Sequence, residues 1–263
     1  MNPSASSLWQ VELPADLDQR LSELLTAAEE QPDPVQIFFR ADDIGRIDSN
    51  FIRMMELFKD FDMPLCPALV PEWLNADSWQ QIRALAAKEK KFCWHQHGFN
   101  HVNHEPVDKK CEFGESRSTE AIRKDILAGR MRLEQLLADS FFPVFTPPWN
   151  RCSSAAMQVL RELDFPALSR STNVQPPAPA DLPDLAINID LHTRREPDPQ
   201  QAMDNLMAEC RTALQSGRMG VMLHHQHMNS TAFLFMEHLF KAINAVSLLI
   251  PCTFRELLRN NCS

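Results

Sequence analysis

Seven of the nine histidines lie in two short segments, WHQHGFNHVNH (94–104) and LHHQH (223–227). A pair of carboxylates, Asp42-Asp43, lies far from both segments in the sequence. Imidazole nitrogens and carboxylate oxygens are the ligands that zinc and similar divalent ions prefer. His97 and His101 are four residues apart, so one helical turn or a tight loop can direct both at one point. A carboxylate from another segment would complete a set of two histidines and one carboxylate.

Such a set supports hydrolysis. A bound metal ion lowers the pKa of a water molecule toward about 7. A second carboxylate beside the ligand carboxylate can take the proton of that water, and a histidine on the opposite side can protonate the leaving group. A metallophosphatase is the rival interpretation, but it needs two ions about 4 Å apart and several bridging carboxylates. The sequence has no obvious set of that kind.

These polar residues follow segments that are typical of buried strands. VQIFF (35–39) precedes the acidic pair, FCWHQH (92–97) ends in the first histidines, and MGVMLHHQH (219–227) ends in the second group. In parallel α/β folds, the carboxyl ends of the strands and the loops after them build the site. We therefore expect the three groups to converge on one face of the fold.

Strand patterns alternate with helix patterns along the whole chain, which predicts a parallel sheet with helical crossovers, as a barrel or a doubly wound sheet. The helix expected over 49–60 has Ser49 as its N-cap. Further strands are expected over 64–71, 143–148, 166–170, 185–192 and 247–252, and further helices over 15–30, 77–90, 119–139, 155–164, 200–216 and 231–245.

We expect residues 1–34 to form a helical extension packed on a single domain over 35–263. The proline-rich segment 171–184 is interpreted as a surface loop rather than a domain boundary. The segment 112–117 (EFGESR) could supply Glu112 and Arg117 to the rim of the site, but a solvated loop is the favoured interpretation.

The order of the motifs resembles that of the NodB-homology polysaccharide deacetylases, carbohydrate esterase family four. Residues 40–43 resemble that family's Thr-Phe-Asp-Asp motif, and residues 97–101 its His-Ser/Thr-x-x-His motif. Residues 146–150 resemble its Arg-x-Pro-x-Tyr/Gly motif, residues 222–224 its Leu-x-His motif, and residues 252–258 the segment that closes its domain. The resemblance covers about 35–258.

The resemblance implies a distorted (β/α)7 barrel and one divalent metal ion, zinc first, with cobalt, nickel or manganese as alternatives. It also implies a role for each matching residue. Asp42 would be the catalytic base and His224 the general acid, with the backbone N–H of Trp149 binding the oxyanion. The metal ligands would be Asp43, His97 and His101.

Several motif positions depart from the family pattern. Thr146 stands where the family has an arginine that orients the base, so that contact is missing or comes from Arg40, Arg46 or Arg151. Gly98 replaces the serine or threonine that braces the metal loop. These departures indicate a divergent branch.

Other polar residues near the motifs are expected to contact the substrate or the metal ligands. His225 competes with His224 for the acid role, because a shift of one residue exchanges the side chain that points inward. Asp190 is the candidate for the family's fourth, acidic motif, and His95 and His104 are expected behind or beside the ligands.

Composition limits the class of partner. The net charge is −9 and the pI about 5.5, which argues against nucleic acid, since its binding needs clustered cations. No segment has the length and apolarity of a membrane span. Seven scattered cysteines and no secretory pattern favour reduced thiols and a cytoplasmic location. The sequence predicts no oligomeric state.

We therefore expect a metal-dependent hydrolase that removes an N-acyl group, N-acetyl above others, from an amino sugar or glycan. A formamido-sugar deformylase is the alternative within the enzymes. A metal-binding or glycan-binding homologue that has lost catalysis is the alternative outside them.

Overall fold

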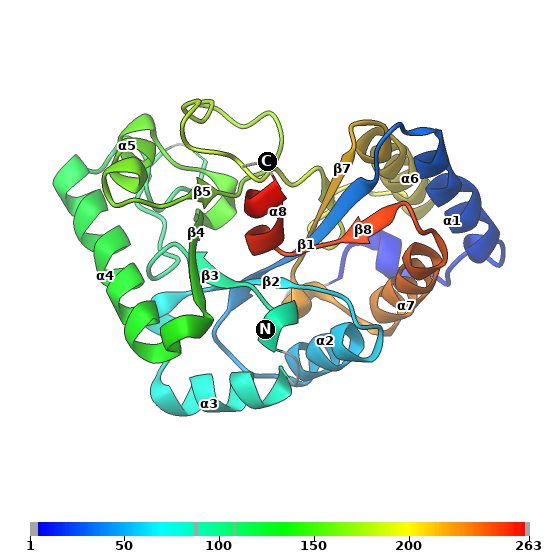
Figure 1. Ribbon diagram of the computed structural model, residues 1–263, viewed down its shortest axis with the longest axis horizontal. Coiled ribbons are helices and arrows are strands. Elements are labelled where there is room, and N and C mark those ends of the chain that lie inside the picture. Colours follow the sequence, from blue (N-terminus) through cyan, green and yellow to red (C-terminus); the bar gives the residue numbers. More distant parts are fainter. Residues whose placement is uncertain (1–4, 87–88, 108, 261–263) are drawn as a thin grey trace.

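The computed structural model describes residues 5–86, 89–107 and 109–260, and is built around one parallel sheet (Figure 1). The strands follow the order β5-β4-β3-β2-β1-β7-β6, and β8 pairs with the beginning of β1. Their bounds are β1 Val35–Ile44, β2 Cys66–Leu69, β3 Trp94–His97, β4 Phe141–Thr146, β5 Ala167–Leu168, β6 Ile189–Asp190, β7 Arg218–Leu223 and β8 Leu249–Pro251.

The two ends of this strand order are connected to each other. The backbone N–H of Leu185 donates to the carbonyl oxygen of Leu168, the last residue of β5. The N–H of Ile187 donates to the carbonyl oxygen of Arg170, just past that strand. The next residue, Asn188, donates to Gly220 of β7. The segment before β6 therefore bridges β5 and β7, and β1 to β7 form a distorted (β/α)7 barrel, as expected.

The interior of the barrel is filled in layers by alternate residues of β1. Phe39 and Ala41 pack into the large core between the sheet and the helices. Phe38, Arg40 and Asp42 alternate with them and therefore point into the barrel. Phe38 lies in an apolar cluster at the bottom, Arg40 is fully buried above it, and Asp42 reaches the top. The strand thus changes from apolar to charged toward the end where the site was expected.

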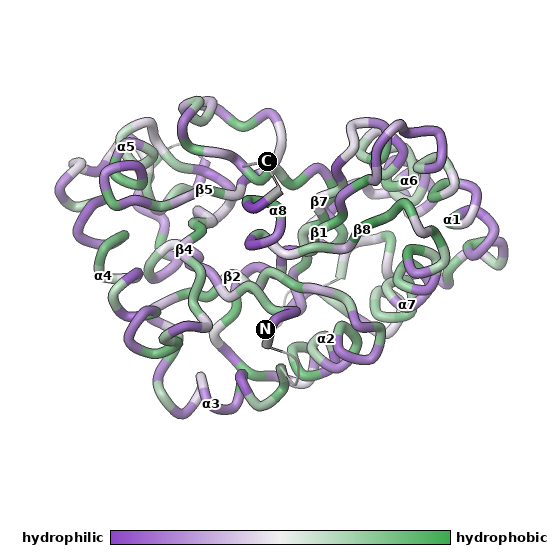
Figure 2. Tube along the Cα trace, viewed as in Figure 1, coloured by the Kyte–Doolittle hydropathy of each residue, from purple (hydrophilic) through white to green (hydrophobic). Residues whose placement is uncertain are grey.

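Helices cover the outside of the barrel (Figure 1), and their residues alternate between hydrophobic and hydrophilic (Figure 2). The exception is the last helix, which contributes Phe254 and Leu257 to the apolar cluster inside the barrel. The bounds are α1 Leu17–Thr26, α2 Ser49–Asp60, α3 Ala76–Leu85, α4 Thr119–Leu137, α5 Ser154–Glu162, α6 Pro199–Gln215, α7 Ser230–Ala245 and α8 Phe254–Asn260.

The N-cap of α2 differs from the prediction. Asp48, not Ser49, has extended backbone, and its side chain accepts a hydrogen bond of 2.8 Å from the N–H of Phe51. Ser49 is already the first residue of the helix. Both residue types are good N-caps, so the choice rests on which one precedes the first turn.

The segment before β1 packs on the barrel's outer helices. α1 contacts α6 and α7, and the indole Nε1 of Trp9 donates to the carbonyl of Leu191 at 2.8 Å. Asn229, which caps α7, donates back to the carbonyl of Trp9. The division of the chain at residue 34 stays a prediction.

The described cysteines are all free and buried, namely Cys66, Cys93, Cys111, Cys152, Cys210 and Cys252. The seventh, Cys262, lies outside the described residues. Within those residues, no helix is both long enough and apolar enough to cross a bilayer.

Candidate active site

Asp43, His97 and His101 converge at the carboxyl ends of β1 and β3. The Oδ1 atom of Asp43 lies 3.0 Å from Nε2 of His97 and 3.0 Å from Nε2 of His101. One ligand atom from each of the three residues lies within 4.8 Å of the others. The three expected ligands are therefore brought together.

The hydrogen bonding of His97 shows that this set fits a cation. Its Nδ1 lies 3.0 Å from the carbonyl oxygen of Thr146, which can only accept, so Nδ1 carries a proton. In a neutral ring, Nε2 is then a lone pair that faces a carboxylate oxygen. A divalent ion bound by the nitrogens and the oxygen satisfies all of these acceptors, and a hydrogen bond from Nδ1 to a carbonyl is the usual support of a histidine ligand.

The backbone is strained at both ends of this cluster. Asp43 and His101 have φ of 61° and 59°, in the left-handed region that costs a non-glycine residue energy. The side chain of Gln226 donates to the carbonyl of Asp43 at 2.9 Å and helps to hold that conformation. In these backbone conformations the side chains of Asp43 and His101 point toward each other.

Glu112 braces the loop that carries the two histidines. Its carboxylate is fully buried and accepts hydrogen bonds from the N–H of Asn100 at 2.8 Å and of Phe99 at 3.3 Å. Gly98, with φ of 57°, leaves room for it, since a Cβ there would lie 2.1 Å from Glu112 Oε2. The carboxylate therefore fills the place of the absent serine or threonine. The interpretation of 112–117 as a solvated loop is wrong at this residue.

Asp42 is held by Arg40 from the same strand. The guanidinium donates from Nε to Oδ1 and from Nη2 to Oδ2, both at 2.8 Å. It also donates to Ser169 and Asn150, so it is fully partnered inside the barrel. Burial alone would raise the pKa of Asp42, but Arg40 and nearby histidines hold it below its usual value. Of the three arginines considered for this contact, the structure selects Arg40.

Thr146 has a different task from the arginine of the family pattern. Its hydroxyl lies 2.9 Å from Nε2 of His95, and its carbonyl receives the hydrogen bond from His97. His95 is completely buried below the cleft, where burial lowers its pKa to about 3. His95 therefore supports the strand ends from beneath.

Trp149 and Asn150 form one side of the site. They have φ of 55° and 59°, and the indole ring lies 4.5 Å from the ring of His101, centroid to centroid. Asn150 Oδ1 accepts from Arg40 at 2.7 Å. This strained turn after β4 thus contacts both Arg40, which holds Asp42, and His101 of the Asp43-His97-His101 cluster.

The two adjacent histidines after β7 point in different directions. His224 lines the cleft, and its buried Nδ1 has no hydrogen-bond partner in the described parts of the chain. The backbone N–H of His224 donates to Nδ1 of His192, 3.2 Å away. His225 instead packs against Phe51, with ring centroids 5.5 Å apart, and lies outside the cleft lining. The geometry therefore favours His224 over His225 as the histidine that faces a ligand in the cleft.

The remaining candidates divide into those that line the cleft and those that do not. Asp190 lines it and accepts from the N–H groups of His192 and Thr193. Arg151 also lines it. Arg46 instead lies over the ring of Trp73 at 5.5 Å, outside the lining residues. His104 is exposed and also outside them.

All of these lining groups face one cleft of about 940 Å³ at the top of the barrel. A cleft of that size is sufficient for a small ligand or for part of a chain. Asp42, Asp43, His97, His101 and His224 form its polar floor and walls.

Comparisons with known proteins agree with this architecture. No protein-family model matches the sequence, and no curated protein matches it. A structure described as a polysaccharide deacetylase from Mycobacterium smegmatis is similar over 88% of this chain and 91% of its own, with a TM-score of 0.65 and 14% identity. The fold is that of the polysaccharide deacetylases.

Two further structures show the range of this fold. A family 4 acetyl xylan esterase from Clostridium thermocellum, in complex with a cobalt ion, covers 86% of this chain and 92% of its own, with a TM-score of 0.53 and 13% identity. A CE4 family pseudoenzyme from Bacillus anthracis covers 87% of this chain and 66% of its own, with a TM-score of 0.55 and 12% identity. The polysaccharide deacetylase fold thus occurs in this comparison with and without catalysis.

Proposed function

We propose that this chain is a metal-dependent hydrolase that removes an N-acyl group, N-acetyl first, from an amino sugar or glycan. The observation that carries the proposal is the Asp43-His97-His101 cluster beside a second carboxylate, Asp42, that is held ionised by a buried arginine. A ligand set and a separate base in one cleft are the minimum for water activation.

Asp43, His97 and His101 would hold the ion, with zinc expected first and cobalt, nickel or manganese as alternatives. When bound, a divalent ion supplies Lewis-acid chemistry, because it lowers the pKa of a water molecule and polarises a carbonyl oxygen.

Asp42 would act as the base. Arg40 holds both of its oxygens in place and lowers its pKa, so the carboxylate is ionised at neutral pH. It would take the proton of the attacking water while the new C–O bond forms at the acyl carbon. The N–H of Trp149 would donate to the oxygen of that carbon as it gains negative charge.

His224 would act as the general acid. It lines the cleft, and no described residue is a hydrogen-bond partner of its Nδ1, which supports contact between that atom and a ligand. It would protonate the nitrogen of the leaving amine as the C–N bond breaks. The products are a free amino sugar and a carboxylate, acetate in the leading case.

Two alternatives remain distinct from this proposal. A formamido-sugar deformylase would use the same groups and release formate. A catalytically inactive homologue is supported by the pseudoenzyme with this fold, and by Thr146 in place of the expected arginine. Against it, Arg40 already supplies the contact that the missing arginine would make. A cytoplasmic site of action stays a prediction.

The decisive experiment combines metal content with turnover. The purified protein, Asp43→Ala and His97→Ala are analysed for bound metal, with the exposed His104→Ala as the matched control. We expect about one ion per chain in the parent and the control, and its loss from both ligand variants. Asp42→Asn should keep the ion but lose turnover of acetylated or formylated amino sugars by about a thousandfold.

A parent protein that binds no metal, even when supplied with zinc or cobalt, would refute the hydrolase. An Asp42→Asn protein that releases acetate or formate as fast as the parent would refute the role of that base. Release of formate but not acetate would select the deformylase.

A further inference from the structure

The cleft is lined by cations although the chain as a whole carries a net charge of −9. They come from separate segments, the loop before Cys111, the turn after β4 and the loop after β6. The five side chains are Lys109, Lys110, Arg151, Arg194 and Arg195.

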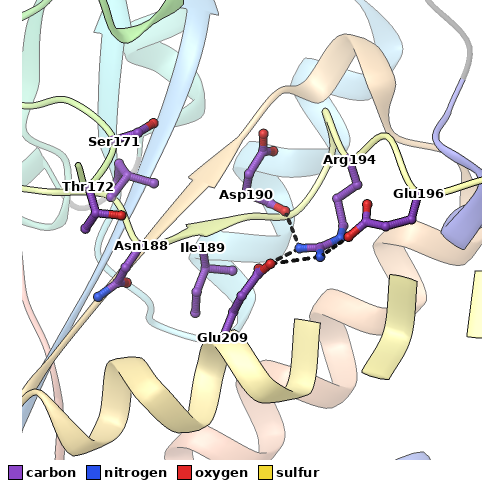
Figure 3. Close-up of a pocket in the computed structure, with 9 residues that line it drawn as sticks. Ser171, Thr172, Asn188, Ile189, Asp190, Arg194, Glu196 and Glu209 are labelled. Atoms are coloured by element: carbon purple, nitrogen blue, oxygen red, sulfur yellow. Dashed lines mark hydrogen bonds and ion pairs between the residues drawn. The ribbon is translucent and has the colours of Figure 1, made fainter. Parts of the chain in front are cut away.

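One of these cations is already neutralised. Arg194 donates to Glu209 and Glu196 and to the carbonyl of Asp190, and these four residues also line a second, smaller pocket (Figure 3). It is therefore a structural ion pair that fixes the loop rather than a group available to a ligand.

The other four cations have no carboxylate within ion-pair distance in the described parts of the chain. Lys109, Lys110 and Arg195 are exposed. Among the described residues, the guanidinium of Arg151 donates to the carbonyl of Lys110, at 3.0 Å, and to no carboxylate. Within that part of the chain, each of the four thus presents an uncompensated positive charge at the cleft.

The carboxylates in the cleft do not neutralise them. Asp42 is paired with Arg40, and Asp43 with the two histidine ligands. Asp190 is engaged by backbone N–H groups and by Thr193. The inner groups are therefore satisfied within the site, and the outer cations remain for something that enters.

Trp149 contacts both the proposed reaction centre and one of the cations. The centroid of its ring lies 4.5 Å from that of His101 and 5.9 Å from Nζ of Lys110. Lys110 and a proposed ligand residue thus share one aromatic neighbour, which suits a charged group on the reacting sugar or on its immediate neighbour.

We infer that the substrate carries an anionic group, a phosphate or a carboxylate, close to the N-acyl group, and that Lys109, Lys110, Arg151 and Arg195 form the subsite for it. This inference rests on the proposed function, because it assigns the charge of the molecule that function would act on. An uncharged glycan would leave the four cations without a partner.

The test is a calorimetric titration of the metal-loaded protein with N-acetylglucosamine, N-acetylglucosamine 1-phosphate and N-acetylmuramic acid. The two charged sugars distinguish phosphate from carboxylate. The double variant Lys109→Gln/Lys110→Gln keeps the ligand set, and Lys59→Gln/Lys241→Gln, two exposed lysines on α2 and α7, is the matched control.

We expect at least one charged sugar to bind about tenfold more tightly than the neutral sugar, because several weak, exposed ion pairs would act together. The double variant should lose most of that preference, about fivefold to tenfold, and the control should keep it. Raising the salt concentration from 0.05 M to 0.5 M should weaken the binding of the charged sugar and leave the binding of the neutral sugar unchanged. Equal binding of charged and neutral sugars, no binding of either charged sugar, or a double variant like the control would overturn the inference.

Release of acetate from the same sugars separates this inference from the proposed function. Hydrolysis together with charge-independent binding would support the proposed hydrolase and contradict the anionic substrate. Charge-dependent binding without hydrolysis of any acetylated or formylated sugar would support the anionic subsite and contradict the proposed hydrolase.

Discussion

Asp42 and Arg40 lie two residues apart on β1, so both side chains point into the barrel and meet there. Their two parallel hydrogen bonds of 2.8 Å hold the carboxylate in one plane. A lysine side chain carries its charge on a single nitrogen, so it cannot reproduce the two parallel hydrogen bonds that arginine makes from two nitrogens.

Arg40→Lys should therefore lower kcat by about 10–100-fold, the range expected for loss of a charge-assisted hydrogen bond of about 1.5–3 kcal/mol. KM and metal content should change little. Steady-state kinetics on a hydrolysed sugar check this, with Arg46→Lys as the control outside the cleft. A kcat within twofold of that of the parent would show that Arg40 does not position Asp42 for the reaction.

Residue types and spacing predicted that Asp43, His97 and His101 would lie together, because a metal site needs few chemical types and a short spacing within the loop. His97 and His101 are such a pair, and Asp43 follows a recognisable buried strand. The sequence could not choose between Arg40, Arg46 and Arg151, since only the path of each side chain decides which one reaches Asp42. Nor could it select Glu112, which is fourteen positions from Gly98 and meets it only through the fold.

At the scale of the element, the loop that carries His97 and His101 depends on Glu112. Burial raises the pKa of this carboxyl, and the N–H groups of Asn100 and Phe99 oppose that rise. The loop thus has no bracing hydroxyl of its own and takes its shape from a separate segment.

Glu112→Gln should weaken metal binding by about 10–100-fold, the usual effect of losing a group that supports a ligand. The amide has one oxygen instead of two and brings a donor that faces other donors. Competition with a chromophoric chelator measures the affinity, and thermal unfolding of the metal-free protein checks that the fold survives. The exposed Glu115→Gln is the control, and equal affinities of the two variants would contradict the brace.

The beginning of α2 offers a second test at this scale. Asp48→Ala should lower the free energy of unfolding by about 1 kcal/mol, because the N–H of Phe51 loses its acceptor. Ser49→Ala should change it by less than half as much, since Ser49 is inside the helix. Urea denaturation of both variants compares them directly, and a larger loss from Ser49→Ala would restore that residue as the cap.

Element positions were predicted more closely for helices than for strands. The helix expected over 200–216 is observed as Pro199–Gln215, since its apolar stripe marks its length. The strand expected over 185–192 has only Ile189–Asp190 in the regular ladder, because residues 184–187 bond instead to the segment after β5. Such closure of the barrel is a long-range pairing that no local pattern contains.

For the whole molecule, a buried neutral histidine makes folding sensitive to acid. His225 is fully buried, neither of its ring nitrogens has a hydrogen-bond partner among the described residues, and burial lowers its pKa to about 4. Because the unfolded chain takes up this proton near pH 6.5 and the folded chain does not, the contribution to stability is complete above pH 6.5. It is lost as the pH falls from there toward 4.

His225→Phe should remove this loss, because phenylalanine can pack against Phe51 and does not titrate. The substitution also removes the approach of Nε2 to the Asp48 carboxylate, 4.0 Å away, which shifts the stability by a pH-independent amount above pH 7. Relative to the parent, the variant should gain about 1–2 kcal/mol of unfolding free energy between pH 7 and pH 5, at up to about 1.4 kcal/mol per pH unit. Denaturant titrations at several pH values measure it, and the difference should be constant above pH 7 as an internal control. A difference that stays constant down to pH 5 would contradict a neutral buried imidazole.

Arg40 and Thr146 have a consequence for how such chains evolve. The family pattern that this sequence resembles has threonine at the first position and arginine at the second, so here the two residue types are exchanged. Both positions are fully buried, and Arg40 alone satisfies Asp42. A change at only one of the two positions would leave Asp42 with no guanidinium or place two of them beside one carboxylate. A motif that requires arginine at the second position would therefore miss a chain like this one, although a guanidinium contacts both oxygens of its Asp42.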